Sequence, residues 1–197
     1  MPNQFYALPK GIAKVLVDDQ SLGGSIFVPY DDENMALASQ FTALGLRCVV
    51  NTKYEKIFDD VFWVAHNKMC DYVICVTAGN PELAEYVTQW GMLVANKAVI
   101  VLDRISFLEP VRKRRDFLTN HRCSNMVVLN PRPQYRQLGS SKDAVTSCWF
   151  TFKRKEDWID GCHITYAVDW NACKPDLDEF KNRHLDRADE GEQQEAG

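Results

Sequence analysis

The chain has 197 residues, 46% of them hydrophobic, and a formal net charge of −4, a size that suits one hydrophobic core. No apolar run approaches the roughly 20 residues that span a bilayer, and residues 1–10 lack the charged start, apolar stretch and cleavage site of a signal peptide. These features exclude a membrane-spanning or secreted protein and predict a soluble, intracellular one.

Helix and strand patterns alternate through the first half of the chain. Apolar residues recur at helical spacing after Pro9, and a glycine pair precedes the short apolar run SIFVP. A second helical pattern closes at Gly45, as is typical of a helix C-terminus. The expected elements are a helix within residues 5–18, strands at 25–29 and 46–50, a helix at 34–44, and a mixed segment of ambiguous state at 54–69.

The second half carries the strongest strand signals. The runs YVICVT and AVIVL are apolar and β-branched, and the segment between them repeats apolar residues at helical spacing. A helix with Pro110 in its first turn follows. The expected elements are strands at 72–77, 98–102 and 125–129, helices at 82–96 and 110–120, and late strands at 146–152 and 163–168 that a hairpin could join.

Continuous apolar strands separated by helices indicate an α/β fold with a mostly parallel sheet, covered by helices on both faces. Ligands of such sheets bind beyond the carboxyl ends of the strands, so the loops after Val28, Val50, Thr77 and Leu102 are the expected site. From Asp176 onward the chain is charged and poor in apolar residues. We therefore expect one domain over residues 1–175 and a disordered tail over 176–197.

The seven cysteines lack the close pairs that a zinc site needs, and several lie in apolar runs. We interpret them as reduced thiols that pack as small hydrophobic groups. The four histidines also lack the spacings of metal hydrolases. No metal site is predicted.

Positive charge is concentrated between Arg104 and Lys155, where twelve Lys and Arg residues outnumber three acids, a local charge of +9 (12 − 3). Such a segment either meets phosphates or forms a solvated face balanced by acids elsewhere in the fold.

Five segments, taken in order, resemble phage-type DNA N6-adenine methyltransferases, which are small class I enzymes dependent on S-adenosylmethionine. The most specific are SFLEP and NPRPQY, each within a longer matching stretch; the others are FYALPKGIAKVLVD, IFVPYDDENMALASQFTALGLRCVV and VICVTAGNPELAEYV. The resemblance covers roughly residues 5–170. It implies a Rossmann-like class I methyltransferase fold with a seven-stranded type of sheet, S-adenosylmethionine as cofactor, DNA as partner and, for a phage-encoded protein, a location in the host cytoplasm.

The resemblance assigns five positions to the cofactor site: Pro9, Pro29, Asp31, Asn51 and Asp60. Asn51 stands where the family has the acid that holds the ribose hydroxyls, and Asp60 matches the acid at the adenine edge. The family's first loop carries glycines that let the backbone approach the cofactor, whereas residues 29–34 contain none. This departure argues against S-adenosylmethionine binding.

The catalytic loop departs in the same way. Asn80 and Pro81 match the amide and the first proline that hold the target amino group, but Glu82 replaces the second proline. Leu83 replaces the aromatic residue that stacks on the flipped base. The resemblance therefore implies an eroded catalytic site.

The matching segments of the back half imply contact with DNA. Basic residues follow the SFLE turn and flank the RPQY loop, where an aromatic ring can stack on a base. The candidate nucleic-acid contacts are Arg112, Arg114, Arg115, Arg132, Tyr135, Arg136 and Lys142.

Three hypotheses follow. The chain is a methyltransferase-like protein that has lost catalysis and keeps the fold and nucleic-acid contact, or an active adenine methyltransferase with divergent motifs. In the third, it is a protein-binding or inhibitory module whose acidic segments, Asp31 to Glu33 and the region from Asp176, form the interaction surface.

Overall fold

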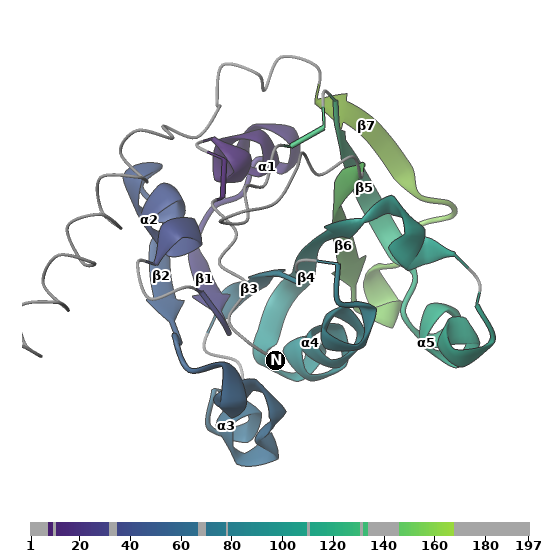
Figure 1. Cartoon of the computed structure of the whole chain (residues 1–197), viewed down its shortest axis with the longest axis horizontal. Coiled ribbons are helices and arrows are strands. Elements are labelled where there is room, and N and C mark those ends of the chain that lie inside the picture. The colour runs from purple at the N-terminus through teal and green to yellow at the C-terminus, as the bar shows by residue number, and fades with distance from the viewer. Residues whose placement is uncertain are drawn as a thin grey trace, which may run out of the picture.

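The structure is a computed structural model that describes residues 8–9, 11–31, 35–66, 70–77, 79–109, 111–130, 132–133 and 146–167 (Figure 1). The α-helices are α1 (Ile12–Gln20), α2 (Ala36–Ala43), α3 (Asp60–Ala65), α4 (Pro81–Val94) and α5 (Arg115–Asn120). The strands are β1 (Ser25–Val28), β2 (Arg47–Val50), β3 (Cys70–Val76), β4 (Ala95–Arg104), β5 (Cys123–Leu129), β6 (Ser147–Lys153) and β7 (His163–Ala167). The 3₁₀ helices are η1 (Tyr54–Phe58), η2 (Ile105–Leu108), η3 (Arg112–Arg114) and η4 (Lys155–Asp157).

Within the described residues, the strands form one seven-stranded sheet in the order β2-β1-β3-β4-β6-β5-β7. All strands run parallel except β6, which is antiparallel to its neighbours β4 and β5. The parallel strands therefore end at the same edge of the sheet. The expected mostly parallel sheet is confirmed.

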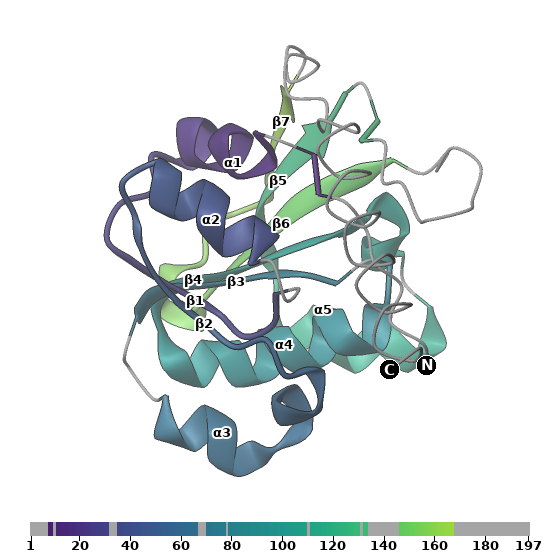
Figure 2. The ribbon, with the colours of Figure 1, turned by 60° about the vertical axis from the view of Figure 1, so that its left-hand side comes forward.

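Helices cover both faces of the sheet (Figure 2): α1 and α2 lie on one face, and α3, α4 and α5 on the other. Alternate residues of each central strand point to opposite faces, so two cores form. Ile74 and Ile100 pack under α1 and α2, where Trp149 Nε1 donates a hydrogen bond to the Ile12 carbonyl at 3.2 Å. Val73 and Val99 pack against the helices of the other face.

Local sequence explains the sharp start of α4, the longest helix described. Asn80 is its N-cap, and the Asn80 side-chain oxygen accepts from the Leu83 N–H at 3.2 Å. Pro81 occupies the first helical position, where the missing N–H costs no hydrogen bond. Gly91 lets this helix lie close to β3 and β4, because a Cβ there would come within 2.9 Å of a Val99 methyl group.

The predicted strands and helices of residues 11–109 are confirmed, with ends displaced by a few residues. The ambiguous segment at 54–69 contains η1 and α3. The helix expected at 110–120 is α-helical only from Arg115, because η3 precedes it as a 3₁₀ turn in which the Arg114 N–H donates to the Val111 carbonyl. Pro110 lies outside the described residues.

The interpretation of the last two strands as a hairpin is wrong. β7 pairs with β5 in parallel, with Asn125 opposite His163 and Leu129 opposite Ala167. Both edges of β6 are already paired, one with β4 and one with β5, so β6 has no edge left for β7.

None of the helices in the described ranges has the length and apolar character that crossing a bilayer requires. The predicted tail at 176–197 lies outside the described residues, so the division into residues 1–175 and a tail stays a prediction.

Candidate functional site

In the described sheet, the neighbouring parallel strands β1 and β3 are followed by connections that lead to opposite sides of the sheet. From β1 the chain passes through α2 to β2 on one side, and from β3 it passes through α4 to β4 on the other. Loops that diverge in this way leave a crevice at the carboxyl ends of the two strands, where ligands of open α/β sheets bind. The candidate site is therefore framed by the loops after β1, β2, β3 and β4, as the sequence predicts.

The loop after β1 is tied to the start of α2. The Asp31 carboxylate is buried and accepts hydrogen bonds from the backbone N–H groups of Leu37 at 3.2 Å and Ala38 at 2.8 Å. A helix N-terminus is a favoured place for an anion, and here the protein supplies the anion itself. Asp32, Glu33 and Asn34 lie outside the described residues.

Met35 precedes α2 with a φ of 52°, in the left-handed region that glycine adopts without strain. The backbone at this position therefore has a conformation that a glycine would adopt with less strain than the methionine does.

The loop after β2 is tied to the loop after β1 through Asn51. The Asn51 amide nitrogen donates to the Pro29 and Lys53 carbonyls, at 2.8 Å each, and its oxygen accepts from the Lys53 N–H at 3.3 Å. The backbone N–H of Asn51 also donates to the Val28 carbonyl at 3.0 Å. The polar atoms of Asn51 thus hold two loops together.

Pro9 and Asp60, the other two predicted cofactor residues, also make contacts within the chain. The buried Pro9 gives its carbonyl to the Gln40 amide at 3.2 Å, which fixes the start of α1 against α2. Asp60 lies at the start of α3 and accepts from the Tyr86 hydroxyl at 3.1 Å. The structure brings Pro29, Asp31 and Asn51 together and places Pro9 and Asp60 with other elements.

The loop after β3 holds the predicted catalytic pair. The oxygen of Asn80 caps α4 by accepting from the Leu83 N–H. Gly79 has a φ of +75°, and a Cβ there would lie 2.5 Å from the Nε atom of Arg104. An exposed arginine side chain therefore lies directly against the backbone of this loop.

A buried acid that sequence reasoning missed stands at the end of β4. The buried Asp103 accepts from the Thr77 hydroxyl and from the Arg104 N–H, the latter at 2.6 Å. Burial raises the pKa of Asp103, although these two donors and the nearby arginines oppose the shift. Its sequence signal is its position, an acid directly after the apolar run AVIVL.

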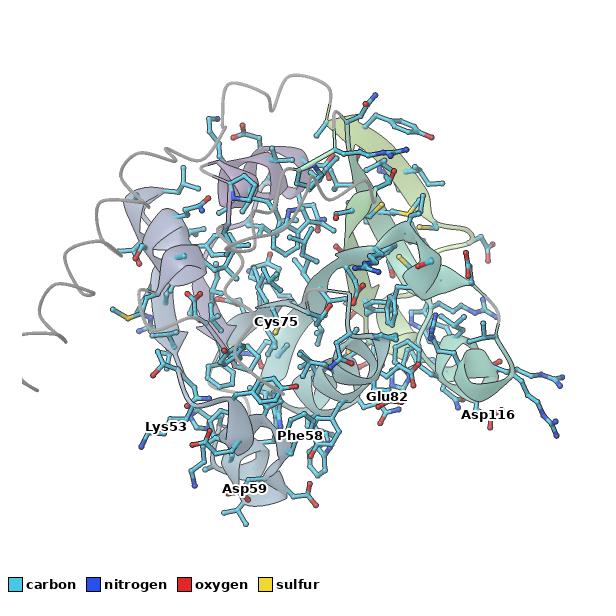
Figure 3. The ribbon with its side chains drawn as sticks, in the orientation of Figure 1. Lys53, Phe58, Asp59, Cys75, Glu82 and Asp116 are labelled. Atoms are coloured by element: carbon cyan, nitrogen blue, oxygen red, sulfur yellow. The ribbon has the colours of Figure 1, made fainter. Side chains whose placement is uncertain are left out.

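Cys75 lies in β3 between the two buried acids. Complete burial raises the pKa of the Cys75 thiol, and the charges of Asp31 and Asp103 raise it further. Figure 3 shows Cys75 at the middle of the sheet, with Lys53 and Asp59 on the side of η1 and α3, and with Glu82 and Asp116 on the side of α4 and α5. This thiol remains protonated and belongs to the core.

Aromatic rings form a chain from the end of β1 to α4. Successive ring centroids are 5.2 Å apart for Tyr30 and Tyr54, 5.4 Å for Tyr54 and Phe58, and 5.3 Å for Phe58 and Tyr86. Tyr54 and Phe58 are exposed. No sequence pattern predicts this row of rings, because its members come from the loop after β1, from η1 and from α4.

The predicted nucleic-acid contacts fall into three groups: exposed, mostly buried, and outside the described residues. Arg112 and Arg115 are exposed after the carboxyl end of β4, and Arg132 is exposed after β5. The Arg114 side chain is only 12% exposed: it pairs with Glu85 at 2.9 Å and donates to the Phe107 carbonyl at 2.6 Å. Tyr135, Arg136 and Lys142 lie outside the described residues.

Solved structures share this architecture. A Vibrio vulnificus protein described as the modification subunit of a type I restriction enzyme matches with a TM-score of 0.53 and 11% identity, over 88% of this chain and 49% of that one. A Listeria monocytogenes protein described as a class I S-adenosylmethionine-dependent methyltransferase matches with a TM-score of 0.51 and 12% identity, over 81% of this chain and 64% of that one. The fold is that of the class I methyltransferases.

The chain thus spans about half of the first of these proteins and less than two thirds of the second. No protein-family profile matches the sequence, and no curated protein is similar to it. The resemblance seen in the sequence is confirmed at the level of the fold.

The groups at the crevice do not suit S-adenosylmethionine as they stand. The loop after β1 has no glycine, the Asp31 carboxylate occupies the start of α2, and the Asn51 amide is bound on both its atoms. In the described ranges, no three His, Cys, Asp or Glu side chains are grouped so that they could hold a metal ion.

Proposed function

We propose that this chain is a methyltransferase-like nucleic-acid-binding protein that does not transfer methyl groups. The observation that carries the proposal is that the polar side chains at the crevice are already hydrogen-bonded within the protein. The side chains that the resemblance assigns to the cofactor and the target base make hydrogen bonds within the chain: Asp31 caps α2, Asn80 caps α4, and Asn51 joins two loops. Opening the site would cost the buried Asp31 carboxylate and the half-buried Asn51 and Asn80 side chains their partners.

Three exposed arginine side chains lie at the same edge of the sheet. Arg104 lies against the loop after β3, and Arg112 and Arg115 extend from the segment after β4. Arginine forks bind phosphate oxygens with two hydrogen bonds, and contacts with the phosphate backbone supply sequence-independent affinity. The solved structure from a restriction enzyme's modification subunit is consistent with DNA as the partner.

The first test addresses the cofactor. Titration calorimetry with S-adenosylmethionine and with S-adenosylhomocysteine should give no binding heat and no rise in the melting temperature of the chain. Micromolar binding of either compound would contradict the proposal and favour the alternative of an active adenine methyltransferase, which methylation of adenine in DNA would then establish.

The second test addresses nucleic acid. Fluorescence anisotropy with labelled duplex DNA should give a dissociation constant that weakens steeply with salt. An R112A/R115A double variant should lower the slope of log K against log salt by about 2, since each phosphate contact contributes roughly 0.9. The matched control is Arg47→Ala, which removes an exposed arginine from β2 at the other end of the sheet. Equal slopes for both variants would contradict the assigned surface.

One observation favours a protein-binding function as the second candidate. Apolar side chains are exposed together on η1 and α3: Phe58 is 48% exposed, Val61 73% and Val64 65%. Adjacent exposed apolar groups of this kind often mark protein interfaces. If DNA does not bind, a V61D/V64D variant that loses association with a partner while its melting temperature stays within a few degrees would support this candidate.

A further inference from the structure

Two cysteines far apart in the sequence meet at the last pair of strands. Cys123 begins β5, and Cys162 directly precedes β7, 39 residues later. Parallel pairing of β5 with β7, with Asn125 opposite His163, brings the starts of these strands together. The two Sγ atoms are 3.7 Å apart, and both residues are half-buried, so small reagents can reach them.

The two thiols differ in acidity because of how they share their hydrogen bond. Cys162 is the more exposed of the two, and in the structure its S–H donates to the Cys123 Sγ. When Cys162 loses its proton, the Cys123 S–H donates to the resulting thiolate instead, which lowers the pKa of Cys162 to about 7. Donating this bond, together with deeper burial, raises the pKa of Cys123. Near neutral pH one sulfur is thus nucleophilic while its neighbour keeps a proton, as in an attacking thiol and a resolving thiol.

The distance between the sulfurs is short enough for a bond. A disulfide has an S–S length of about 2.05 Å, so the sulfurs must approach by roughly 1.7 Å from their present separation. β7 is the terminal strand of the sheet and is hydrogen-bonded to β5 alone among the described strands. A terminal strand can shift toward its neighbour more easily than a strand held on both sides.

We propose that Cys123 and Cys162 form a thiol–disulfide site, oxidised by a low-molecular-weight disulfide such as glutathione disulfide, which joins β7 covalently to β5. The Cys162 thiolate attacks one sulfur of glutathione disulfide; an S–S bond forms, the old S–S bond breaks, and one glutathione thiolate leaves. Cys123 then loses its proton to solvent and attacks the Sγ of Cys162, which expels the second glutathione thiolate. The two protein thiols together give up two protons and two electrons, and glutathione disulfide takes the electrons.

The bond would change the stability of the fold in a direct way. A disulfide that closes a segment of this length restricts the unfolded chain and so favours the folded state. The oxidised protein should melt roughly 5–15 °C above the reduced protein. This inference concerns the edge of the sheet away from the crevice, and it does not depend on the proposed function.

The experiment exposes the full chain to glutathione disulfide, quenches it with an alkylating reagent, and maps its peptides by mass spectrometry. The wild type should yield a peptide cross-linked through Cys123 and Cys162, together with the higher melting temperature. Cys48→Ser is the matched control, because Cys48 is also half-buried but lies in β2, at the opposite edge of the sheet. This variant should behave as the wild type does.

The single variants of the pair separate the two roles. Cys123→Ser should retain one glutathione bound to Cys162, because the resolving thiol is gone, whereas Cys162→Ser should react much more slowly. Neither variant should gain thermal stability on oxidation. The absence of a Cys123–Cys162 cross-link in folded wild type, or a glutathione adduct that persists there on Cys162, would overturn the proposal.

Discussion

A single missing side chain sets how closely α4 approaches the sheet. Gly91 lies on the buried side of α4, where a Cβ would come within 2.9 Å of one Val99 methyl group and 3.2 Å of a Val73 methyl group. These methyl groups belong to β-branched side chains in the core and cannot move away freely. The glycine is therefore a packing residue, although it lowers the intrinsic preference of the segment for a helix.

We predict that Gly91→Ala destabilises the protein by about 1–3 kcal/mol, because overpacking outweighs the gain in helix preference. The matched control is Gly23→Ala, where a Cβ would meet nothing within 4 Å. Urea unfolding of both variants measures the difference. A Gly91→Ala variant as stable as the control would mean that α4 can move away from β3 and β4 without cost.

Asp103 gives the pH dependence of stability a definite sign. Because burial raises its pKa in the folded state, the folded protein binds this proton more tightly than the unfolded chain does. The resulting stabilisation is fully present below the unfolded pKa of about 3.9 and is lost as the pH rises through the folded pKa.

We predict that Asp103→Asn, which cannot ionise, becomes more stable relative to the wild type as the pH rises from about 4 to about 7. Urea unfolding at several pH values measures this difference, and the other acids largely cancel because both proteins carry them. If the difference in unfolding free energy does not change with pH, the Asp103 carboxyl has the same pKa in the folded and unfolded states.

At the scale of elements, the Arg114 side chain links the segment between β4 and α5 to helix α4. Arg114 pairs with Glu85 of α4, donates to the carbonyls of Ser106 and Phe107 in η2, and lies over the Phe107 ring at 5.4 Å. These contacts join two 3₁₀ turns to the long helix. Because of these contacts, Arg114 is mostly buried, whereas Arg112 and Arg115, which the sequence analysis assigned to the same basic surface, are exposed.

We predict that Arg114→Ala lowers the free energy of unfolding by about 1–3 kcal/mol, since it leaves a partly buried Glu85 and the Phe107 carbonyl without the arginine donor, whereas the Ser106 carbonyl still accepts from the Glu109 N–H. Arg112→Ala, at an exposed position in the same 3₁₀ turn, should change it by no more than about 0.5 kcal/mol. Thermal or urea unfolding distinguishes the two. Similar effects for both variants would show that the contacts of Arg114 add nothing to stability.

Local pattern predicted the elements well and their long-range partners poorly. Runs such as YVICVT and AVIVL predict buried strands because β-branched residues fill both of their faces, and β3 and β4 confirm this. The pairing of β7 with β5 depends on which strand edge remains free, and this is a property of the whole sheet.

For the candidate site, too, the sequence predicts the position of the loops but not the contacts of their side chains. Chain order predicts that the loops after β1, β2 and β3 share one edge, but the hydrogen bonds of Asp31 to α2 depend on side-chain direction. The meeting of Cys123 with Cys162 depends on strand pairing. No spacing in the sequence encodes either contact.

At the scale of the whole molecule, net charge differs between the two ends of the sequence. The last 22 residues carry eight acids and three bases, so they contribute −5 to a chain whose total is −4, and residues 1–175 alone carry +1 (−4 minus −5). Residues 1–175 are therefore slightly basic on their own, and their positive charge is densest between Arg104 and Lys155. Acidic segments close in sequence to a basic surface compete with phosphates for it.

We predict that a chain ending at residue 175 keeps the melting temperature of the full chain within a few degrees and binds duplex DNA several-fold more tightly at low salt, with the advantage shrinking as salt screens the acids. Differential scanning calorimetry and anisotropy titrations measure the two effects, and a full-length variant with its eight terminal acids changed to Asn or Gln is the control for length. A large loss of thermal stability would place the domain boundary beyond residue 175. Unchanged affinity at low salt would show that the acidic end does not compete for the basic surface.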